Sequence, residues 1–152
     1  MSTFADSSAL VKLYADEAGQ ADIRSLASIA VAQLARVEVP AALWRKQRLG
    51  ELSATDARLL TADFEADYFG TDSEEPRFAA LAVTTQLLDE AARLCAVHGL
   101  RAYDAVQLSA ALAARQADDT CTTMAAFDRL LRAAAAAEGF SLVPLDLAAR
   151  PS

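Results

Sequence analysis

The sequence predicts a three-layer α/β/α fold with a central, mostly parallel sheet of four to five strands. Short apolar segments suited to strands alternate along the chain with longer segments of helical periodicity. Strands that alternate with helices favour parallel pairing, with helices on both faces of the sheet. The 152 residues contain no internal repeat and no linker. We therefore expect one domain over residues 1–146 and a flexible C-terminal tail over residues 147–152.

Five short apolar segments are the predicted strands: residues 3–5, 29–31, 78–83, 120–124 and 141–145. The first predicted helix follows at once and runs through Tyr14, with Ser7 or Ser8 as its cap. The other predicted helices cover residues 19–26, 33–48, 53–68, 84–98, 103–114 and 127–138. Ser53 and Asp56 have the spacing of a capping box, and Gly99 is placed to end a helix in the left-handed conformation.

Charge and composition narrow the possible functions. A formal net charge of -7 argues against broad non-specific binding to nucleic acid, which needs a basic surface. It does not exclude a nucleic-acid enzyme, because bound cations offset an acidic site. We expect a cytoplasmic protein, since the sequence has neither a signal peptide nor an apolar stretch of membrane-spanning length. Cys95 and Cys121 lack metal-site spacing and, as two buried thiols, suit a reducing compartment.

Four carboxylates occur where predicted strands end or the following helices begin. Asp6 comes directly after the first strand, whereas Glu38, Asp104 and Asp128 lie near helix starts. The carboxyl ends of parallel strands meet at one edge of a sheet, where ligands bind in such folds. Carboxylate oxygens suit Mg²⁺ or Mn²⁺, and acids this close would repel one another without a cation. The pattern is therefore compatible with a divalent-metal site formed by these four residues.

Each acid also has an ordinary structural interpretation. An aspartate at a helix start is commonly a cap, which by itself would explain Asp104 and Asp128. Glu38 taken alone suits a solvated helix position. Asp6 is the least ordinary, because a carboxylate directly after a buried strand needs a reason. A further acidic helix face is predicted to be solvated surface only, and consists of Asp56, Asp63, Glu65 and Asp67.

Four segments of the chain resemble the motifs of PIN-domain ribonucleases, and most of all those of the VapC toxins of type II toxin–antitoxin systems. They are residues 4–14, which contain Asp6, residues 36–45 with Glu38, residues 98–108 with Asp104, and residues 127–131 with Asp128. The motifs stand in the family's order between about Phe4 and Leu145. The resemblance implies a PIN-like fold with these four acids as the catalytic and metal-binding residues, supported by Ser8.

The activity implied by this resemblance is Mg²⁺- or Mn²⁺-dependent hydrolysis of RNA by an endoribonuclease that acts as a toxin. Residues 122–128 are looser than the family's fourth motif, so direct metal binding by Asp128 stays open, with Thr122 and Thr123 as alternatives. No histidine base is required, and His98 is expected to be a helix-end residue that suits the dipole.

The implied partners are an RNA substrate, a VapB-like antitoxin and a second copy of the chain in a homodimer. Basic residues on the segments that carry Asp6 and Glu38 are candidate contacts for RNA phosphates: Lys12, Arg45 and Lys46, with Arg36 and Arg48. Trp44 suits either base stacking or the core, and Leu13 and Tyr14 suit either a dimer contact or core packing.

Two other functions stay open at this point. A receiver-like phospho-accepting domain also gathers acids around Mg²⁺ at a strand edge, but it needs a late lysine, and no lysine follows Lys46. A PIN-like binding module without catalysis is the other alternative, and the intact acids argue against it.

Overall fold

The computed structural model describes residues 1–147, so the predicted tail lies outside the described residues except for Leu147. These residues form five strands, β1 (Thr3–Ala5), β2 (Ile29–Ala32), β3 (Phe78–Leu81), β4 (Thr123–Ala125) and β5 (Ser141–Val143). The helices are α1 (Ser7–Val11), α2 (Gln20–Arg24), α3 (Ala35–Arg48), α4 (Ala54–Phe69), α5 (Thr85–His98), α6 (Ala102–Ala117) and α7 (Arg129–Ala137). None of the helices within residues 1–147 has the length and apolar character needed to cross a membrane.

The strands form one sheet in the order β3-β2-β1-β4-β5, and every neighbouring pair is parallel. The predicted α/β/α class is therefore confirmed, with all five strands present. The chain moves outward from β1 to β3 and then crosses to β4 on the other side of β1. The carboxyl ends of β1 and β4 consequently flank the point where the strand order reverses, which is the usual ligand-binding position in open parallel sheets.

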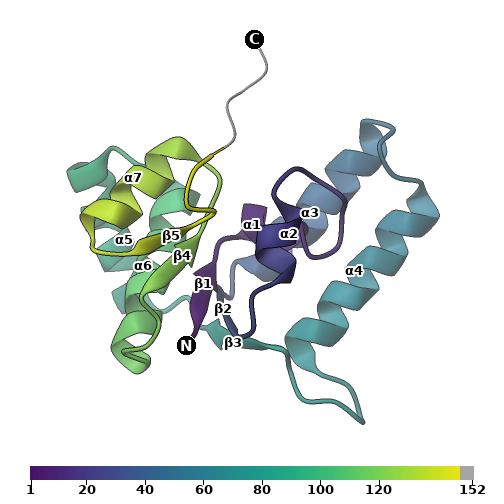
Figure 1. The fold of residues 1–152 in the computed structure, drawn as a ribbon, viewed down its shortest axis with the longest axis horizontal. Helices are drawn as coiled ribbons and strands as arrows, with labels where there is room; N and C mark the ends of the chain where they lie inside the picture. Colours follow the sequence, from purple (N-terminus) through teal and green to yellow (C-terminus); the bar gives the residue numbers. More distant parts are fainter. Residues whose placement is uncertain (148–152) are drawn as a thin grey trace.

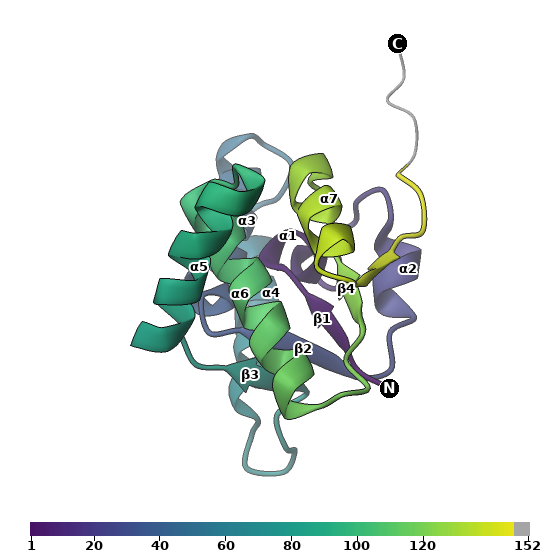
Figure 2. The same cartoon turned by 90° about the vertical axis from the view of Figure 1, so that its left-hand side faces the viewer.

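Helices cover both faces of the sheet (Figure 1). Helices α5, α6 and α7 lie on one face and α1 to α4 on the other, and the turned view in Figure 2 shows the same layers. Successive strand residues point to opposite faces, so Phe4 packs with the first group of helices and Ala5 with the second. Every residue of β1 and β2 is buried, as expected for inner strands of a parallel sheet, whereas β3 and β5 at the sheet edges are partly exposed.

The start of α1 differs from the prediction that Ser7 or Ser8 caps it. The cap is Asp6, whose Oδ1 accepts a hydrogen bond of 2.8 Å from the Ala9 backbone nitrogen. The helix also ends at Val11, before Tyr14. Asp6 has extended backbone and a short side chain, which places its carboxylate in reach of the free N–H groups of the first turn.

Several other boundaries shift for local reasons. The strand predicted at residues 120–124 is β4, which begins only at Thr123 because the Asp118 carboxylate binds the backbone nitrogen and the hydroxyl of Thr120 in a turn. Strand β3 ends at Leu81 and β5 at Val143, shorter than predicted. Helix α7 begins at Arg129 because Asp128 caps it. The predicted ends at Ser53 and Gly99 are confirmed: Ser53 caps α4, and Gly99 ends α5 with φ 66°.

The acidic face of α4 is not merely solvated. Asp56, Asp63 and Glu65 are exposed, but the Asp67 carboxylate accepts a hydrogen bond of 2.6 Å from the Tyr14 hydroxyl. The Tyr14 ring in turn packs edge-on against Phe64 of α4, with ring centroids 5.8 Å apart. Leu13 and Tyr14 both pack against the core on this face. Of the two predicted roles for this pair, the structure shows core packing. Cys121 is buried as predicted, whereas Cys95 is only half-buried.

Candidate active site

The four predicted acids lie at the carboxyl edge of the sheet. Two of them cap helices and two are in the first turn of a helix. Asp6 caps α1 directly after β1, and its backbone nitrogen donates to the carbonyl oxygen of Ala125 at the end of β4. Glu38 is in the first turn of α3, which follows β2. Asp104 is in the first turn of α6, and Asp128 caps α7 after β4. The charges of Asp104 and Glu38 both raise the pKa of Asp6, and the charge of Asp128 raises that of Asp104, so the acids form one electrostatically connected group.

Asp6 is the buried member of this group, with 5% of its surface exposed. Burial raises its pKa to about 7, against hydrogen bonds from the Ala9 backbone and the Ser8 side chain that lower it. The Ser8 hydroxyl donates to the Asp6 carboxylate over 2.8 Å, so Ser8 contacts the acid that it was predicted to support. Burial and the neighbouring acids both disfavour the charged form of Asp6, and a bound cation would stabilise that form.

Glu38 is held by two side chains that the sequence analysis did not single out. Its Oε1 accepts hydrogen bonds from the Ser7 hydroxyl at 2.9 Å and from the Gln107 amide nitrogen at 2.7 Å. The same amide nitrogen donates to the Ser7 hydroxyl at 2.9 Å. One signal was available in the sequence: Gln107 stands three residues after Asp104, on the same face of the helix.

The amide oxygen of Gln107 is buried and has no hydrogen-bond partner. Gln107 is 3% exposed, and its amide nitrogen is committed to Glu38 and Ser7. Native proteins rarely leave such an acceptor unpaired, and each case calls for an explanation such as a water or an ion. This orphan oxygen adds a further acceptor beside the acids.

Arg101 pairs with Asp104 and Asp128, two acids of the group that are partly exposed. Its Nη2 lies 3.3 Å from Asp104 Oδ2 and 3.7 Å from Asp128 Oδ2. Burial raises the pKa of Asp104, whereas the Arg101 charge lowers it. The cap interpretation holds for Asp128, which accepts from the Leu131 backbone nitrogen at 3.0 Å, but not for Asp104, because the cap position of α6 is occupied by Arg101.

The oxygen donors at this edge suit a hard divalent cation, although their side chains are not arranged in a complete coordination site. Within residues 1–147, no group of three or more His, Cys, Asp or Glu side chains is arranged to hold a metal ion. Carboxylate and amide oxygens are nevertheless the ligand types that Mg²⁺ and Mn²⁺ take, with water supplying the rest. The high pKa of Asp6 and the unpaired Gln107 oxygen are the two features that a cation would satisfy.

Two of the predicted RNA contacts are engaged inside the protein. Lys12 is buried, with its ammonium 2.9 Å from the Glu17 carboxylate and 4.3 Å from the centre of the Phe127 ring. Lys46 pairs with the same Glu17 and, at 3.3 Å, with Glu51. Both lysines therefore pair with Glu17 in the loop after α1. The other predicted contacts, Arg36, Arg45 and Arg48, are exposed.

The same loop packs beside Asp128. Gly19 has φ 86°, and a Cβ there would lie 2.6 Å from the Phe127 ring, so only glycine fits. A cavity of about 560 Å³ opens next to this contact, and its lining includes Lys12, Phe127, Asp128 and Arg129. The structure thus places a hollow with basic and aromatic side chains immediately beside one of the four acids.

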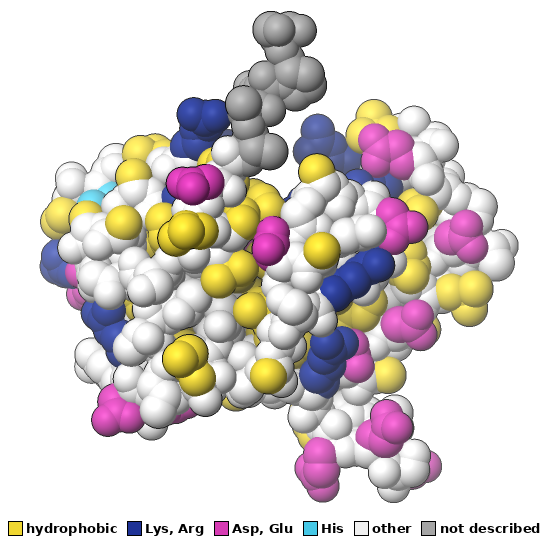
Figure 3. Space-filling model, in the orientation of Figure 1, with side chains coloured by type: hydrophobic (Ala, Val, Ile, Leu, Met, Phe, Trp, Pro, Cys, Tyr) yellow, Lys and Arg dark blue, Asp and Glu magenta, His cyan; other side chains and the backbone are white. Residues whose placement is uncertain are grey.

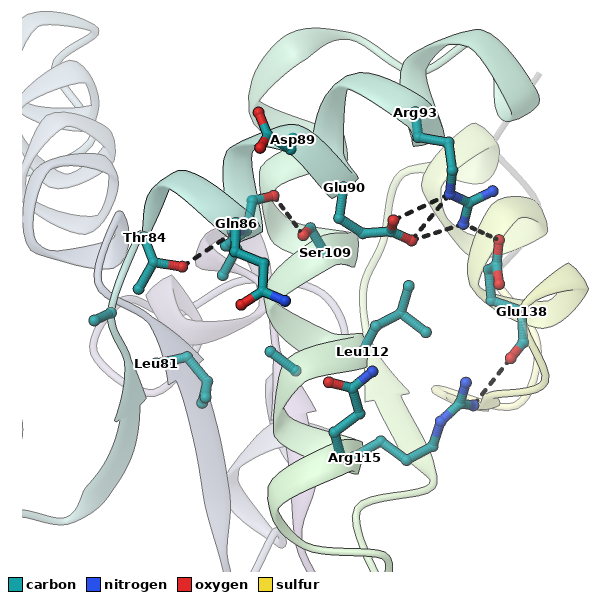
Figure 4. A pocket seen from close by; sticks show the side chains of 14 residues that line it. Leu81, Thr84, Gln86, Asp89, Glu90, Arg93, Ser109, Leu112, Arg115 and Glu138 are labelled. Atoms are coloured by element: carbon teal, nitrogen blue, oxygen red, sulfur yellow. Dashed lines mark hydrogen bonds and ion pairs between the residues drawn. The ribbon is translucent and has the colours of Figure 1, made fainter.

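A second cavity lies apart from the acids (Figure 4). It has a volume of about 720 Å³, and the residues that line it include Leu87 and Glu90 of α5 with Ser109 and Leu112 of α6. None of the four acids lines it. His98, the last residue of α5, binds Glu138 at 2.8 Å, which agrees with its predicted place at a helix end.

Replacing Gln107 with glutamate should destabilise the protein in a pH-dependent way. The new carboxylate would be buried against Glu38, and burial beside a like charge favours its protonated form. Because its folded-state pKa would exceed the unfolded value, stability should fall as pH rises, by about 2–3 kcal/mol between pH 5 and pH 8. Urea unfolding at the two pH values measures this. Gln116→Glu, at an exposed position of the same helix, is the control, and equal pH profiles for both variants would contradict the Glu38 contact.

Comparison with known proteins gives a structural relative. No protein-family model matches the chain, and no curated protein matches it. Among solved structures, the chain is similar to PAE2754 from Pyrobaculum aerophilum, known from a crystal structure, with a TM-score of 0.57 and 25% sequence identity. The match covers 88% of this chain and 79% of that chain. It supports the α/β/α architecture described above.

Proposed function

We propose that the protein is a Mg²⁺- or Mn²⁺-dependent endoribonuclease of the PIN-domain type, acting as the toxin of a type II toxin–antitoxin pair. The observation that carries this proposal is Asp6: a carboxylate buried at the reversal point of a parallel sheet, with a pKa raised to about 7 by burial and by Asp104 and Glu38. Such a group is costly in a metal-free protein and becomes favourable beside a cation. The resemblance of all four acidic motifs to this family adds to that argument.

Asp6, Glu38, Asp104 and Asp128 would hold the cation. When bound, it supplies a water of lowered pKa and offsets charge on the attacked phosphate and on the leaving oxygen. The chain's own residues prepare the site: Ser8 and the Ala9 backbone orient Asp6, and Ser7 with Gln107 orients Glu38. Fixed carboxylates of this kind need no rearrangement when the substrate arrives.

Two exposed side chains at the edge that carries the four acids can contact an anionic, single-stranded substrate. Figure 3 shows acidic side chains on the protruding loop between α4 and β3, where Asp72, Glu74 and Glu75 are exposed. That loop leads into β3 and so lies toward the amino ends of the strands, opposite the four acids. At the carboxyl edge, Arg101 and Tyr103 are 79% and 66% exposed, and both suit single-stranded RNA, the guanidinium for phosphate and the ring for stacking.

The proposed antitoxin and the second copy of the chain would use exposed surface near this edge. Val37 and Tyr103, each next to one of the acids in sequence, are 68% and 66% exposed. An antitoxin segment that packs on these side chains and places an arginine among the carboxylates would occupy the cation's position.

The test is cleavage of single-stranded RNA by the purified protein with Mn²⁺ and with excess EDTA, beside Asp104→Asn. Cleavage should require Mn²⁺, stop in EDTA, and fall about a hundredfold or more in the variant, because one charged oxygen ligand is lost. Asp119→Asn makes the same charge change at an exposed position and should retain full activity. Cleavage that persists in EDTA or in Asp104→Asn would overturn the proposal.

A further inference from the structure

Arg101 is a cation set among the acids of the candidate site. Its guanidinium lies 3.3 Å from Asp104 and 3.7 Å from Asp128, and Asp104 also accepts a 3.4 Å bond from Arg101 Nε. In the part of the chain that the structure describes, Asp6 and Glu38 pair with no basic side chain. The nearby Lys12 is committed to Glu17. Arg101 therefore neutralises the outer half of the acid group and leaves the inner half uncompensated.

We propose that Arg101 is an exchangeable counter-ion, which pairs with Asp104 and Asp128 in the metal-free protein and is displaced when a divalent cation binds. This inference rests on the metal-dependent activity proposed above and adds a residue that controls access of the cation to the acids. Once displaced, the guanidinium is free to pair with a phosphate of the RNA at the same edge.

The contacts of Arg101 suit exchange. Its side chain is 79% exposed, its bonds to Asp104 and Asp128 are long, and it makes no capping bond to α6. Exposed ion pairs of this kind are weak, and their geometry is not held by packing. A divalent ion carries twice the charge and takes oxygen from the inner acids as well, so it competes favourably for the same carboxylates.

Once displaced from the carboxylates, Arg101 can also bind an RNA phosphate. Arg101 immediately precedes α6, two residues before Tyr103, and both side chains extend into solvent beside Asp104. A guanidinium binds phosphate oxygens through two parallel bonds. The positive charge of Arg101 would thus oppose cation binding and favour RNA binding. A variant without this charge should bind the cation more tightly and RNA more weakly.

The experiment is a calorimetric titration of the metal-free wild type and of Arg101→Gln with Mn²⁺, followed by measurement of the KM for single-stranded RNA. Arg101→Gln should bind Mn²⁺ roughly three- to tenfold more tightly, because a competing charge is removed, and should have a KM several-fold higher. Arg101→Lys keeps the charge and should stay near the wild type in Mn²⁺ affinity. Arg93→Gln makes the same charge change at an exposed residue paired with Glu90, outside the acid group, and should change neither quantity.

The outcomes separate this inference from the function on which it rests. Equal or weaker Mn²⁺ binding by Arg101→Gln would overturn the counter-ion role while leaving the metal site intact. A wild type that binds no Mn²⁺ would overturn the proposed metal-dependent activity and this role with it. Tighter binding by Arg93→Gln as well would attribute the effect to net charge alone and also overturn the inference.

Discussion

Replacing Asp6 with asparagine should reduce RNA cleavage at least a thousandfold and at the same time stabilise the metal-free protein above neutral pH. Activity is lost because the neutral amide is a poor ligand for a hard cation. The fold persists because asparagine is as good a helix cap as aspartate and its side-chain oxygen can accept the bond from the Ala9 backbone. A residue that contributes only to structure would show the reverse, with stability lost and activity following it.

The pH dependence follows from the pKa of Asp6. Burial raises the folded-state pKa to about 7, whereas the unfolded value is near 3.9, so between these values the folded protein binds more protons than the unfolded chain. This contribution to stability is present at acid pH and is lost as pH rises from about 4 to 7, at up to about 1.4 kcal/mol per pH unit. Asp6→Asn has no such group and should lack that slope.

Urea unfolding of both proteins across pH 4–8, followed by circular dichroism, measures the effect. Added Mn²⁺ should stabilise the wild type at pH 8 and leave Asp6→Asn unchanged, because only the wild type gains a paired charge. Asp119→Asn, at an exposed position, controls for the loss of one charge. Parallel pH profiles for wild type and Asp6→Asn would show that the Asp6 carboxylate is not disfavoured in the folded protein.

Replacing Arg132 with leucine should lower the free energy of unfolding by about 3 kcal/mol or more. Arg132 is 6% exposed, and its guanidinium donates to three backbone carbonyls, those of Ala126, Pro144 and Leu145, at 2.9, 2.7 and 3.1 Å. These bonds join the segment after β4 to the segment after β5. Leucine fills similar space but leaves the buried Ala126 carbonyl oxygen without a donor, which is costly, and also removes the donor of the part-buried Pro144 and Leu145 carbonyls.

The same denaturant measurement, with Arg129→Leu as the control on the first turn of α7, tests this effect. Arg129 is exposed, so its replacement should change stability by less than about 0.5 kcal/mol. Arg132→Lys should fall between the two, because an ammonium cannot reach carbonyls on two segments as a guanidinium does. Equal stability of the two leucine variants would show that the carbonyl contacts of Arg132 contribute little.

Local patterns in the sequence were sufficient for the architecture. Alternation of short apolar segments with helical periodicity predicts a parallel sheet between helices, and Ser53 and Gly99 mark helix ends that the structure confirms. These features depend on residues within a few positions of each other, so a pattern reports them directly. Element ends were less accurate, as at Thr123, because a side chain in the adjoining turn competed for backbone hydrogen bonds.

For the candidate site, the sequence predicts the positions of the acids but not their hydrogen-bond partners. The positions of Asp6, Glu38 and Asp128 could be predicted from the sequence, since each follows a strand and parallel strands end at the same edge of the sheet. Asp104 follows helix α5 instead, and the packing of α6 against α5 brings it to that edge. Their partners were not readable: Ser7, Gln107 and Glu38 are bonded across separations of 31, 69 and 100 residues. Lys12 was likewise a predicted phosphate contact, but tertiary packing places its ammonium over the Phe127 ring and against the Glu17 carboxylate. Short-range order follows from backbone preference and hydrophobic period, whereas burial, charge pairing and the resulting pKa of Asp6 arise only when distant segments pack together and exclude water.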